Sequence, residues 1–314
     1  MQTMLRGATI SFPMFGNLSV NPASSFTLFG HTFYWYGAII ALGFILAILY
    51  CSRRSKAFTG VSSDDLFDFV LWLIPVAIIG ARLYYVLFSF SHYSSHPADI
   101  FKIWEGGLAI YGGIIAGVLL ALIWSRKKRI PLGALGDIAV YGLLIGQSIG
   151  RWGNFINREA FGRETAVFCR MGLTMPGSET IYVHPTFLYE SLWNFAGFLL
   201  LHFYFKKHER KFDGEVTLLY VAWYGFVRAM IEGLRTDSLY IPGTAIRVSQ
   251  LLAAVSAIVA VVLLVLLLRR KHQPELYVRR VACAGAADAA PVDTGNSDPD
   301  SDAVAPDHGS DHDT

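Results

Sequence analysis

Long apolar stretches recur along this chain, and short polar junctions separate them. A helical stretch of about 20 apolar residues is long enough to cross the roughly 30 Å hydrocarbon core of a bilayer. By this measure the sequence predicts seven transmembrane helices, at residues 34–51, 66–89, 107–124, 133–150, 186–205, 216–234 and 247–268. The fourth and sixth have the weakest pattern, because each carries charge or many glycines. The predicted fold is an all-α polytopic membrane protein with a small polar segment on its outer face.

The composition supports a membrane protein and excludes an ordinary soluble domain. Of the 314 residues, 54% are hydrophobic and only 16% are charged, whereas about 25% of the residues in an average soluble domain are charged. The first residues, MQTMLRGATISFPMF, lack a basic region followed by a continuous apolar run, so they do not resemble a cleaved signal peptide. We expect the first predicted helix to serve as the targeting element.

Basic residues gather at every second junction between the predicted helices. They are Arg53, Arg54 and Lys56, then Arg126, Lys127, Lys128 and Arg129, then Lys206, Lys207, Arg210 and Lys211, and finally Arg269, Arg270 and Lys271. Junctions rich in lysine and arginine stay in the cytoplasm, and a chain with seven spans returns to that side at every second junction. The alternation predicts an outer N-terminus and a cytoplasmic C-terminus.

The C-terminal segment has a different composition from the rest of the chain. Beyond residue 281 there are eight Asp and no Lys or Arg. Such a segment buries too little apolar surface to offset its loss of conformational entropy on ordering. We therefore divide the chain into a membrane-embedded domain at 1–280 and a disordered, acidic cytoplasmic tail at 281–314.

Arginines also occur where the topology does not explain them. They are Arg82, Arg151, Arg158, Arg163, Arg170, Arg228, Arg235 and Arg247, all in the predicted outer half of the membrane or just outside it. A charge at membrane depth is costly and indicates function unless it only ties helices together, as a pair of Arg228 with Glu232, four residues apart, would do. Guanidinium groups bind phosphate through two hydrogen bonds, and a phospholipid headgroup is the anion found at this depth.

The stretch 146–163, GQSIGRWGNFINREAFGR, is the densest polar feature of the chain. It contains Arg151, Asn154, Asn157, Arg158, Glu159 and Arg163 within one short segment. If the segment stays helical, Arg151, Asn154 and Arg158 share one face. Gly153 and Gly162 allow close backbone approach or a positive φ. The alternative is that this segment is only the ordinary polar end of a transmembrane helix. That alternative does not explain why so many Arg, Asn and Glu residues lie together at the level of the lipid headgroups.

Gly146-Gln-Ser148-Ile-Gly150 matches the G-x-S-x-G pattern of serine hydrolases. In the hydrolases the pattern follows a strand, which is not predicted here. Together with Gly142, the two glycines form a small-residue stripe suited to close helix packing. Packing is therefore the favoured interpretation, and Gly113-Ile-Ile-Ala-Gly117 is interpreted in the same way.

His184, Tyr189 and Glu190 lie close together in the sequence and are a second alternative for acid–base chemistry. A lone histidine at a helix start is more often an interfacial or capping group. The cysteines Cys51, Cys169 and Cys283 are scattered, without disulfide or metal spacing. We expect no metal, no organic cofactor and no nucleic-acid partner.

Several spaced blocks of the chain resemble the prolipoprotein diacylglyceryl transferase family, in the family's own order. The strongest is 151–163, RWGNFINREAFGR, and the others are Trp35-Tyr36-Gly37, Gly80-Ala-Arg82 with Tyr85, Trp104-Glu-Gly-Gly107 with Gly112-Gly113, His184-Pro185 with Leu188-Tyr189-Glu190, and Tyr224-Gly225-Phe226 with Arg228, Glu232 and Arg235. The similarity extends from about residue 30 to 268. It implies a seven-helix enzyme of the bacterial plasma (inner) membrane. This enzyme transfers the diacylglyceryl group of phosphatidylglycerol to the lipobox cysteine of a prolipoprotein signal peptide.

The resemblance also implies roles for individual residues. The headgroup-binding arginine of the family corresponds to Arg151, and we add Arg228 and Arg82 as headgroup ligands. The required tyrosine, asparagine and glycine of the family correspond to Tyr36, Asn154 and Gly162, and its important charged residues to Glu159, Arg228 and Glu232. On its own, Tyr36 would be interpreted as an interfacial aromatic anchor.

One block departs from the family pattern. Many members have a histidine, proposed to activate the thiol, where Tyr111 stands here in Leu108-Ala-Ile-Tyr111-Gly-Gly. A phenol with a pKa near 10 is a poor base at pH 7 unless nearby arginines lower that pKa. Tyr111 is therefore a candidate base or a substrate-orienting group, and a third alternative is that the arginines favour the thiolate directly.

Two other classes of function compete with an enzyme. A transporter or scramblase of anionic lipids would use the same arginines as a passage, and broken helices with a central charge cluster would favour it. A non-catalytic membrane scaffold would leave the outward arginines without a purpose. The predicted depth of the arginines favours the enzyme.

Overall fold

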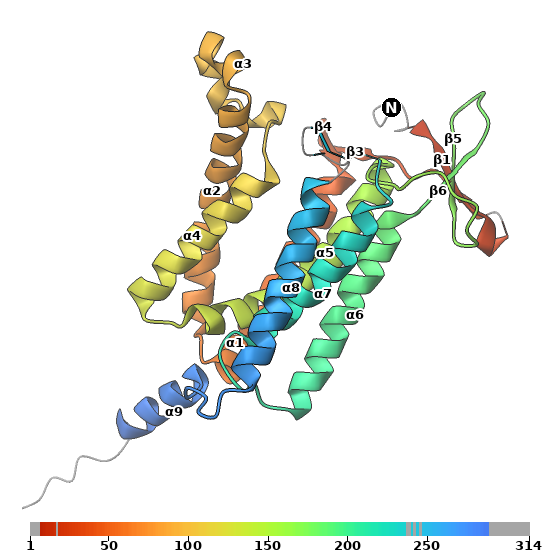
Figure 1. Ribbon diagram of the computed structural model, residues 1–314. Helices are drawn as coiled ribbons and strands as arrows, with labels where there is room; N and C mark the ends of the chain where they lie inside the picture. Colours follow the sequence, from red (N-terminus) through yellow and green to blue (C-terminus); the bar gives the residue numbers. More distant parts are fainter. Residues whose placement is uncertain (1–6, 17, 237–239, 241–242, 245–246, 289–314) are drawn as a thin grey trace, which may run out of the picture.

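Seven long helices make up most of the computed structural model, which describes residues 7–16, 18–236, 240, 243–244 and 247–288 (Figure 1). They are α1 (Trp35–Thr59), α2 (Ser63–Phe88), α4 (Ile110–Lys128), α5 (Leu132–Asn157), α6 (Thr186–Lys207), α7 (Glu215–Glu232) and α8 (Val248–Leu268). Each helix coincides with one predicted span. Several are longer than predicted, because the helix continues past the apolar run into the basic junction that follows.

Five of these helices, α1, α2, α4, α5 and α8, are long and apolar enough to cross a membrane. α7 carries three charged residues, Glu215, Arg228 and Glu232, within 18 residues. α6 is also outside this group of five, and it carries a buried glutamate, Glu190. The chain is thus a mostly helical, polytopic membrane protein, and the two long helices outside the group of five carry side chains of the site described below.

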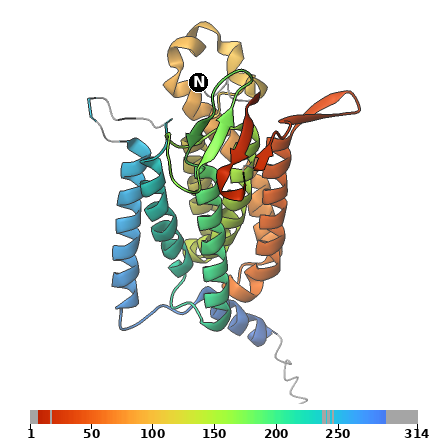
Figure 2. The same ribbon diagram turned by 90° about the vertical axis from the view of Figure 1, so that its right-hand side faces the viewer.

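Six short strands correct the expectation of an all-α protein. They are β1 (Thr9–Phe12), β2 (Leu18–Val20), β3 (Ser25–Leu28), β4 (His31–Tyr34), β5 (Met171–Thr174) and β6 (Ile181–Val183). Four of them form an antiparallel sheet in the order β2-β1-β5-β6, in which Ile10 lies opposite Leu173. Strands of three or four residues are too short to give a clear alternating pattern. We call the end of the molecule that carries them the sheet end (Figures 1 and 2).

The opposite end of the molecule carries the basic junctions and an additional helix, α9 (Tyr277–Asp288), and we call it the α9 end (Figure 1). The buried side chain of Leu276 and a hydrogen bond of 2.9 Å from the Tyr277 amide to Asp213 hold this helix against the bundle. The domain boundary predicted at residue 280 falls inside α9, so regular structure continues past it. The rest of the predicted tail, residues 289–314, lies outside the described residues.

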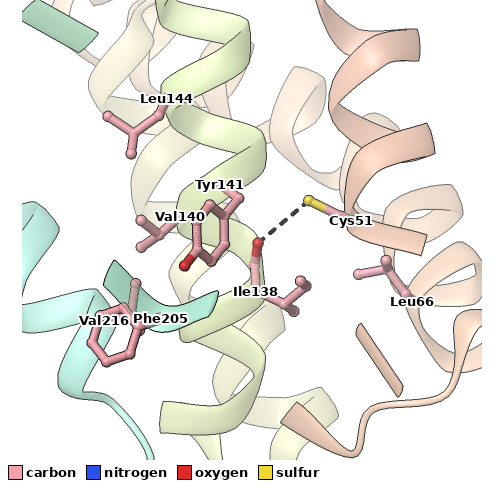
Figure 3. Close-up of a cluster of buried hydrophobic side chains, with 8 residues drawn as sticks. All are labelled: Cys51, Leu66, Ile138, Val140, Tyr141, Leu144, Phe205 and Val216. Atoms are coloured by element: carbon pink, nitrogen blue, oxygen red, sulfur yellow. Dashed lines mark hydrogen bonds between the residues drawn. The ribbon is translucent and has the colours of Figure 1, made fainter. Parts of the chain in front are cut away.

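Helix α5 is the central element of the bundle and packs against α1, α6 and α7. Figure 3 shows part of its buried contact surface, where Tyr141 and Leu144 lie among side chains of the neighbouring helices. In the same cluster the Cys51 thiol donates to the carbonyl oxygen of Ile138 at 3.3 Å. The glycine stripe of α5 faces α1, since a Cβ on Gly142 would lie 3.2 Å from the Cys51 sulfur. The packing interpretation of this stripe is confirmed at that position.

Helices α2 and α4 form a second close pair through glycine. A Cβ on Gly80 would lie 2.3 Å from the Cβ of Ala116, and a Cβ on Gly112 would lie 2.3 Å from the carbonyl oxygen of Gly80. Backbone therefore meets backbone at this crossing, which is the approach that small residues permit in membrane helices. The pair leans away from the rest of the bundle toward the sheet end (Figure 1).

A buried ion pair connects the elements at the α9 end. Arg210 donates to Asp137 at 2.6 Å and to Asp213 at 3.0 Å, and its other terminal nitrogen donates to the Phe58 carbonyl at 2.8 Å. Asp137 also accepts from the Thr217 amide at 2.8 Å. The side chains of Arg210 and Asp137 are 1% and 0% exposed, so this buried network joins α1, α5, α7 and the junction before α7.

Candidate functional site

Three arginines from two helices and the following loop surround the carboxylate of Glu190. Glu190 lies in the second turn of α6 and is 2% exposed. Arg151 of α5 forms an ion pair with it, Arg228 of α7 lies 3.2 Å away, and Arg235 lies 3.7 Å away. A buried carboxylate needs such partners, because an unpaired charge in a low-dielectric interior is strongly unfavourable. Glu190 therefore holds three guanidinium groups together near the sheet end of the bundle.

A second glutamate extends this cluster along α7. Arg228 and Glu232 lie one helical turn apart and form an ion pair at 2.7 Å, as their spacing predicted. Arg247, the residue before α8, donates to the backbone carbonyl of Glu232 and stacks on Tyr240. Together with Glu159, described next, these groups comprise four arginines and three glutamates.

The chain leaves α5 through a sharp turn that returns a carboxylate to the helix. Arg158 follows the last helical residue with φ +52°, in the left-handed region, and the helix ends there. The Glu159 amide donates to the Asn154 carbonyl at 3.0 Å, and the Glu159 carboxylate accepts from the Asn154 side chain at 3.0 Å. Asn154 in turn accepts from Arg151 at 3.2 Å. Arg151, Asn154 and Glu159 thus form one hydrogen-bonded chain.

Two glycines allow the close contacts that complete this region. A Cβ on Gly153 would lie 2.7 Å from the ring of Tyr36, so the tyrosine packs directly on the α5 backbone beside Asn154. A Cβ on Gly162 would lie 2.7 Å from the Cβ of His184 and 3.1 Å from the Leu234 carbonyl. The Gly162 amide donates to the His184 carbonyl at 2.9 Å. Gly162 therefore lets the loop after α5 lie flat against the segments before α6 and after α7.

A cavity of about 390 Å³ opens onto this cluster between α4, α5, α7 and α8. Arg151, Arg228 and Arg235 line it, and so do apolar residues such as Leu252. Tyr111 also lines it, and its hydroxyl lies 2.8 Å from that of Ser249. The cavity thus combines cationic groups with an apolar wall, which matches the two chemical parts of a phospholipid.

Arg82 is not among the residues that line this cavity. Its guanidinium group lies under the loop between α2 and α4 and donates to backbone carbonyls there, those of Asp99, Ile100, Lys102, Gly106 and Gly107. Its side chain is buried, and the ring of Tyr93 covers it. In this arrangement Arg82 organises a loop rather than presenting a cation to a ligand.

Three more of the outward arginines hold backbone segments. Arg158, 2% exposed, donates to the Ala8 carbonyl at 3.0 Å and to the Asn21 side chain, so it anchors the N-terminal strands instead of sharing a face with Arg151. Arg163 donates to the Gly233 carbonyl, and Arg170 donates to the Ala166 carbonyl. The outward arginines therefore divide into a group around Glu190 and Glu232 and a group that shapes loops.

The two alternative sites suggested by the sequence have different surroundings. Ser148 is buried and donates to the Ser191 carbonyl at 3.0 Å, and its own carbonyl accepts from the Ser191 hydroxyl at 2.8 Å. It therefore joins α5 to α6. Burial and the nearby Arg163 lower the pKa of His184, which favours the neutral imidazole. Among the described residues, no group of three His, Cys, Asp or Glu side chains is placed to hold a metal ion.

Glu190 and Ser249 are the two residues of this region whose part the sequence did not reveal. Glu190 was interpreted together with His184, but its carboxylate contacts the arginines instead. The available signal was the excess of arginines, which require a buried acid as a partner. Ser249 gave no signal, since a serine in the first turn of an apolar helix is common and its partner Tyr111 is distant in sequence.

The fold and the cavity define a polytopic membrane protein with an arginine-rich polar site near one end of its helices. The chain matches the family model of the prolipoprotein diacylglyceryl transferases over residues 23–266. A protein of Streptococcus agalactiae named phosphatidylglycerol–prolipoprotein diacylglyceryl transferase is 43% identical over 245 residues, which cover 76% of this chain and 93% of the relative. Proteins of the same name from Finegoldia magna and Enterococcus faecalis are each 44% identical and are covered to 96% and 91% of their lengths.

The chain therefore belongs to the prolipoprotein diacylglyceryl transferase family and is a membrane-bound transferase of lipoprotein biosynthesis. The resemblance predicted from the sequence blocks is confirmed. The match covers all seven long helices apart from the last residues of α8, so the arginine cluster and the cavity both lie within it.

Proposed function

We propose that the enzyme transfers the sn-1,2-diacylglyceryl group of phosphatidylglycerol to the thiol of the lipobox cysteine in prolipoprotein signal peptides. The cysteine sulfur forms a bond to the glyceryl carbon that carries the phosphodiester, and the carbon–oxygen bond to phosphate breaks. Glycerol phosphate leaves, and the thiol proton passes to a base. The product is a thioether, and the reaction is the first step of bacterial lipoprotein maturation.

The observation that carries this proposal is the cavity that both Arg151 and Arg228 line together with apolar side chains. Negative charge develops on the phosphate oxygen as the carbon–oxygen bond breaks. Fixed cations beside that oxygen stabilise the transition state more than the ground state, which is how preorganised electrostatics accelerates a reaction. Glu190 and Glu232 hold the two guanidinium groups in position before the substrate arrives.

The other residues of the site have supporting roles in the same proposal. Asn154 and Glu159 fix the orientation of Arg151 through their hydrogen bonds. Tyr36 lies against Gly153 and within electrostatic range of both Arg151 and Glu159, where it contacts the bound substrate. Gly162 keeps the loop after α5 in place.

Tyr111 is the residue of the cavity most suited to orient the incoming thiol. Its hydroxyl already has a partner in Ser249, with which it connects the first turns of α4 and α8. If Tyr111 acts as the base, the arginines that line the cavity have to stabilise its phenolate form. Tyr111 therefore has three alternative roles. It is the base, it orients the thiol, or it has no role because the arginines favour the thiolate directly.

We further propose that all seven long helices span the plasma membrane, with the sheet end outside and the α9 end in the cytoplasm. The four basic junctions lie at the α9 end (Figure 1), in agreement with the retention of basic loops in the cytoplasm. Arg151 lies six residues before the end of α5, or about 9 Å along the helix axis. The site would therefore face the outer leaflet, where the lipobox cysteine follows the apolar part of its signal peptide.

The same placement argues against a lipid transporter. The long helices continue without interruption, even α2 with its internal Pro75. The charged cluster lies near one end of the helices, and a passage through the membrane would need cationic groups along its length. A one-sided site suits chemistry at one leaflet.

The proposal is tested with purified full-length protein, phosphatidylglycerol and a synthetic lipobox peptide, followed by mass spectrometry of the peptide. Wild-type protein adds one diacylglyceryl mass. Arg151→Ala lowers the rate by about 100- to 1000-fold, the cost of removing one group that stabilises developing charge. Arg170→Ala is the matched control, because this arginine lies in an outer loop. Undiminished rates in both Arg151→Ala and Asn154→Ala would contradict the proposed site.

A further inference from the structure

A second and larger cavity lies between α1, α5 and α6, in the half of the bundle nearer the α9 end. Its volume is about 690 Å³. Helices α1 and α6 each pack along α5, so α5 forms the floor of a groove and the other two helices form its walls. The residues that line it include none of the arginines or glutamates around Glu190. It is therefore separate from the proposed site of transfer.

The chemistry of the groove changes along its length. Toward the middle of the bundle it is lined by apolar side chains, represented by Leu46 on α1, Ile149 on α5 and Phe195 on α6. Toward the α9 end it is lined by Arg53 and Arg54. One end thus suits a hydrocarbon chain, and the other end suits an anion.

The two arginines at the charged end are available to a ligand in different ways. The guanidinium carbon of Arg54 lies 4.6 Å from the ring centroid of Phe58 and 5.3 Å from that of Tyr141, and its Nε is buried without a hydrogen bond. Arg53 is exposed at the mouth of the groove. Within the described part of the chain, no carboxylate forms an ion pair with either residue. Arg54 is thus held by aromatic rings.

A hydrogen bond crosses the groove at the level where its chemistry changes. The hydroxyl of Tyr50 on α1 lies 2.6 Å from Nδ1 of His202 on α6. On α1, Tyr50 stands between the apolar residues and Arg53. The bond fixes the separation of the two walls, so the groove is a built feature of the bundle.

The length of the groove matches one leaflet of a bilayer. On α1 it runs from Leu46 to Ala57, and at 1.5 Å per residue these eleven steps cover about 16 Å. Half of the hydrocarbon core of a bilayer is about 15 Å thick. A groove of this length, apolar at the bilayer centre and cationic at the surface, has the dimensions and charge of a site for one acyl chain and its phosphate.

We propose that this groove binds an anionic phospholipid of the cytoplasmic leaflet, with one acyl chain between α1, α5 and α6 and the phosphate on Arg53 and Arg54. The inference uses the orientation proposed above, but it does not depend on the transfer reaction. Bound lipid would fill the space between α1 and α6 and neutralise Arg54 against the aromatic rings.

The test uses full-length protein in phosphatidylcholine vesicles that contain a trace of lipid with a photoreactive acyl chain. The probe is either phosphatidylglycerol or phosphatidylcholine, and the labelled peptides are mapped by mass spectrometry. The phosphatidylglycerol probe labels residues 46–57 and 195–202 at least about fivefold more than the phosphatidylcholine probe. Equal labelling by the two probes overturns the proposal, because the arginines would then not distinguish an anionic headgroup from a zwitterionic one.

The variant Arg53→Gln/Arg54→Gln reduces labelling of the groove by phosphatidylglycerol to the phosphatidylcholine level. The matched control is Arg126→Gln/Lys127→Gln, at the basic end of α4, which leaves labelling unchanged. If the double variant does not fold, Arg53→Gln alone, at an exposed position, gives a reduction of at least twofold. Unchanged labelling in a folded Arg53 variant overturns the proposal.

Two further measurements separate this site from the site of transfer. Arg151→Ala leaves labelling of the groove unchanged while it lowers transfer, so failure of one proposal does not imply failure of the other. A lipobox signal peptide with a photoreactive residue labels the cavity around Tyr111 and not the groove. Labelling of the groove by this peptide in preference to phosphatidylglycerol overturns the assignment to a lipid.

Discussion

Arg228 on α7 lies 3.2 Å from the carboxylate of Glu190 on α6. This contact joins two helices at the depth where Arg151 reaches the same carboxylate from α5. A single buried acid therefore sets the relative positions of three helices at the site. Activity should depend on this acid even though it need not touch a substrate.

Glu190→Gln keeps the shape of the side chain and removes its charge. We expect the rate of diacylglyceryl transfer to fall by about 100-fold, because a displacement of about 1 Å in the catalytic groups costs this much. Glu190→Asp, which keeps the charge, restores part of the rate. The comparison is made by peptide mass spectrometry at saturating phosphatidylglycerol, so that kcat is measured separately from KM. Equal rates for Glu190→Gln and wild type would show that the acid does not position the arginines.

Gly162→Ala tests the close approach of the loop after α5. The new Cβ would lie 2.7 Å from His184 and 3.1 Å from the Leu234 carbonyl, and overpacking of this kind costs about 1–3 kcal/mol. We expect a lower midpoint of thermal unfolding and loss of most activity, because Glu159 moves with this loop. Gly146→Ala is the control, since a Cβ there has no atom within 4 Å. An active Gly162→Ala protein with unchanged stability would exclude this packing role.

Tyr111→Phe distinguishes the three roles considered for this residue. If the phenol is the base, the variant loses activity at all pH values, and the rise of the wild-type rate with pH disappears. If the phenol orients the thiol, the rate falls by about tenfold with an unchanged pH profile, and Ser249→Ala produces the same change, because Ser249 holds the phenol. An unchanged rate in Tyr111→Phe shows that the arginines favour the thiolate without a contribution from the phenol. The measurement is the transfer rate between pH 6 and pH 10.

The buried ion pair of Asp137 and Arg210 leads to a prediction about the stability of the protein. Removal of one partner of a buried ion pair costs about 3–5 kcal/mol, because the other charge remains buried without compensation. Asp137→Ala should lower the free energy of unfolding by this amount in mixed micelles, followed by circular dichroism. Asp68→Ala is the control, because its side chain is 59% exposed and 3.9 Å from Lys128, and an exposed pair of this kind contributes little to stability. Equal losses in the two variants would contradict the structural role of Asp137.

The helices of this protein were predictable because their signal is long and repeated. Apolar runs such as that of α8, with no charge over 21 residues, have one physical explanation in a membrane protein. The strands were not predictable, because β1 and β5 pair across about half of the chain and each has only four residues, too few for an alternating pattern to be distinctive. The elements that could be predicted are those whose sequence pattern extends over many residues.

The site was predictable in part, for a related reason. Local spacing indicated the pair of Arg228 and Glu232, and the residue block after α5 indicated Arg151 and Asn154. The division of the arginines was not visible, since nothing in the sequence distinguishes an arginine that binds loop carbonyls, such as Arg82, from one that faces a cavity. That difference arises only when the helices are packed.

The pairing of β1 with β5 imposes an order on the biogenesis of the protein. Ile10 lies opposite Leu173, so the first strand leaves the ribosome long before its partner does. At 5–20 residues per second, the interval is on the order of ten seconds. During this interval α1, α2, α4 and α5 can enter the membrane, while the N-terminal segment remains without the neighbour that completes its sheet. The four-stranded sheet is therefore completed only after the first four long helices have been made.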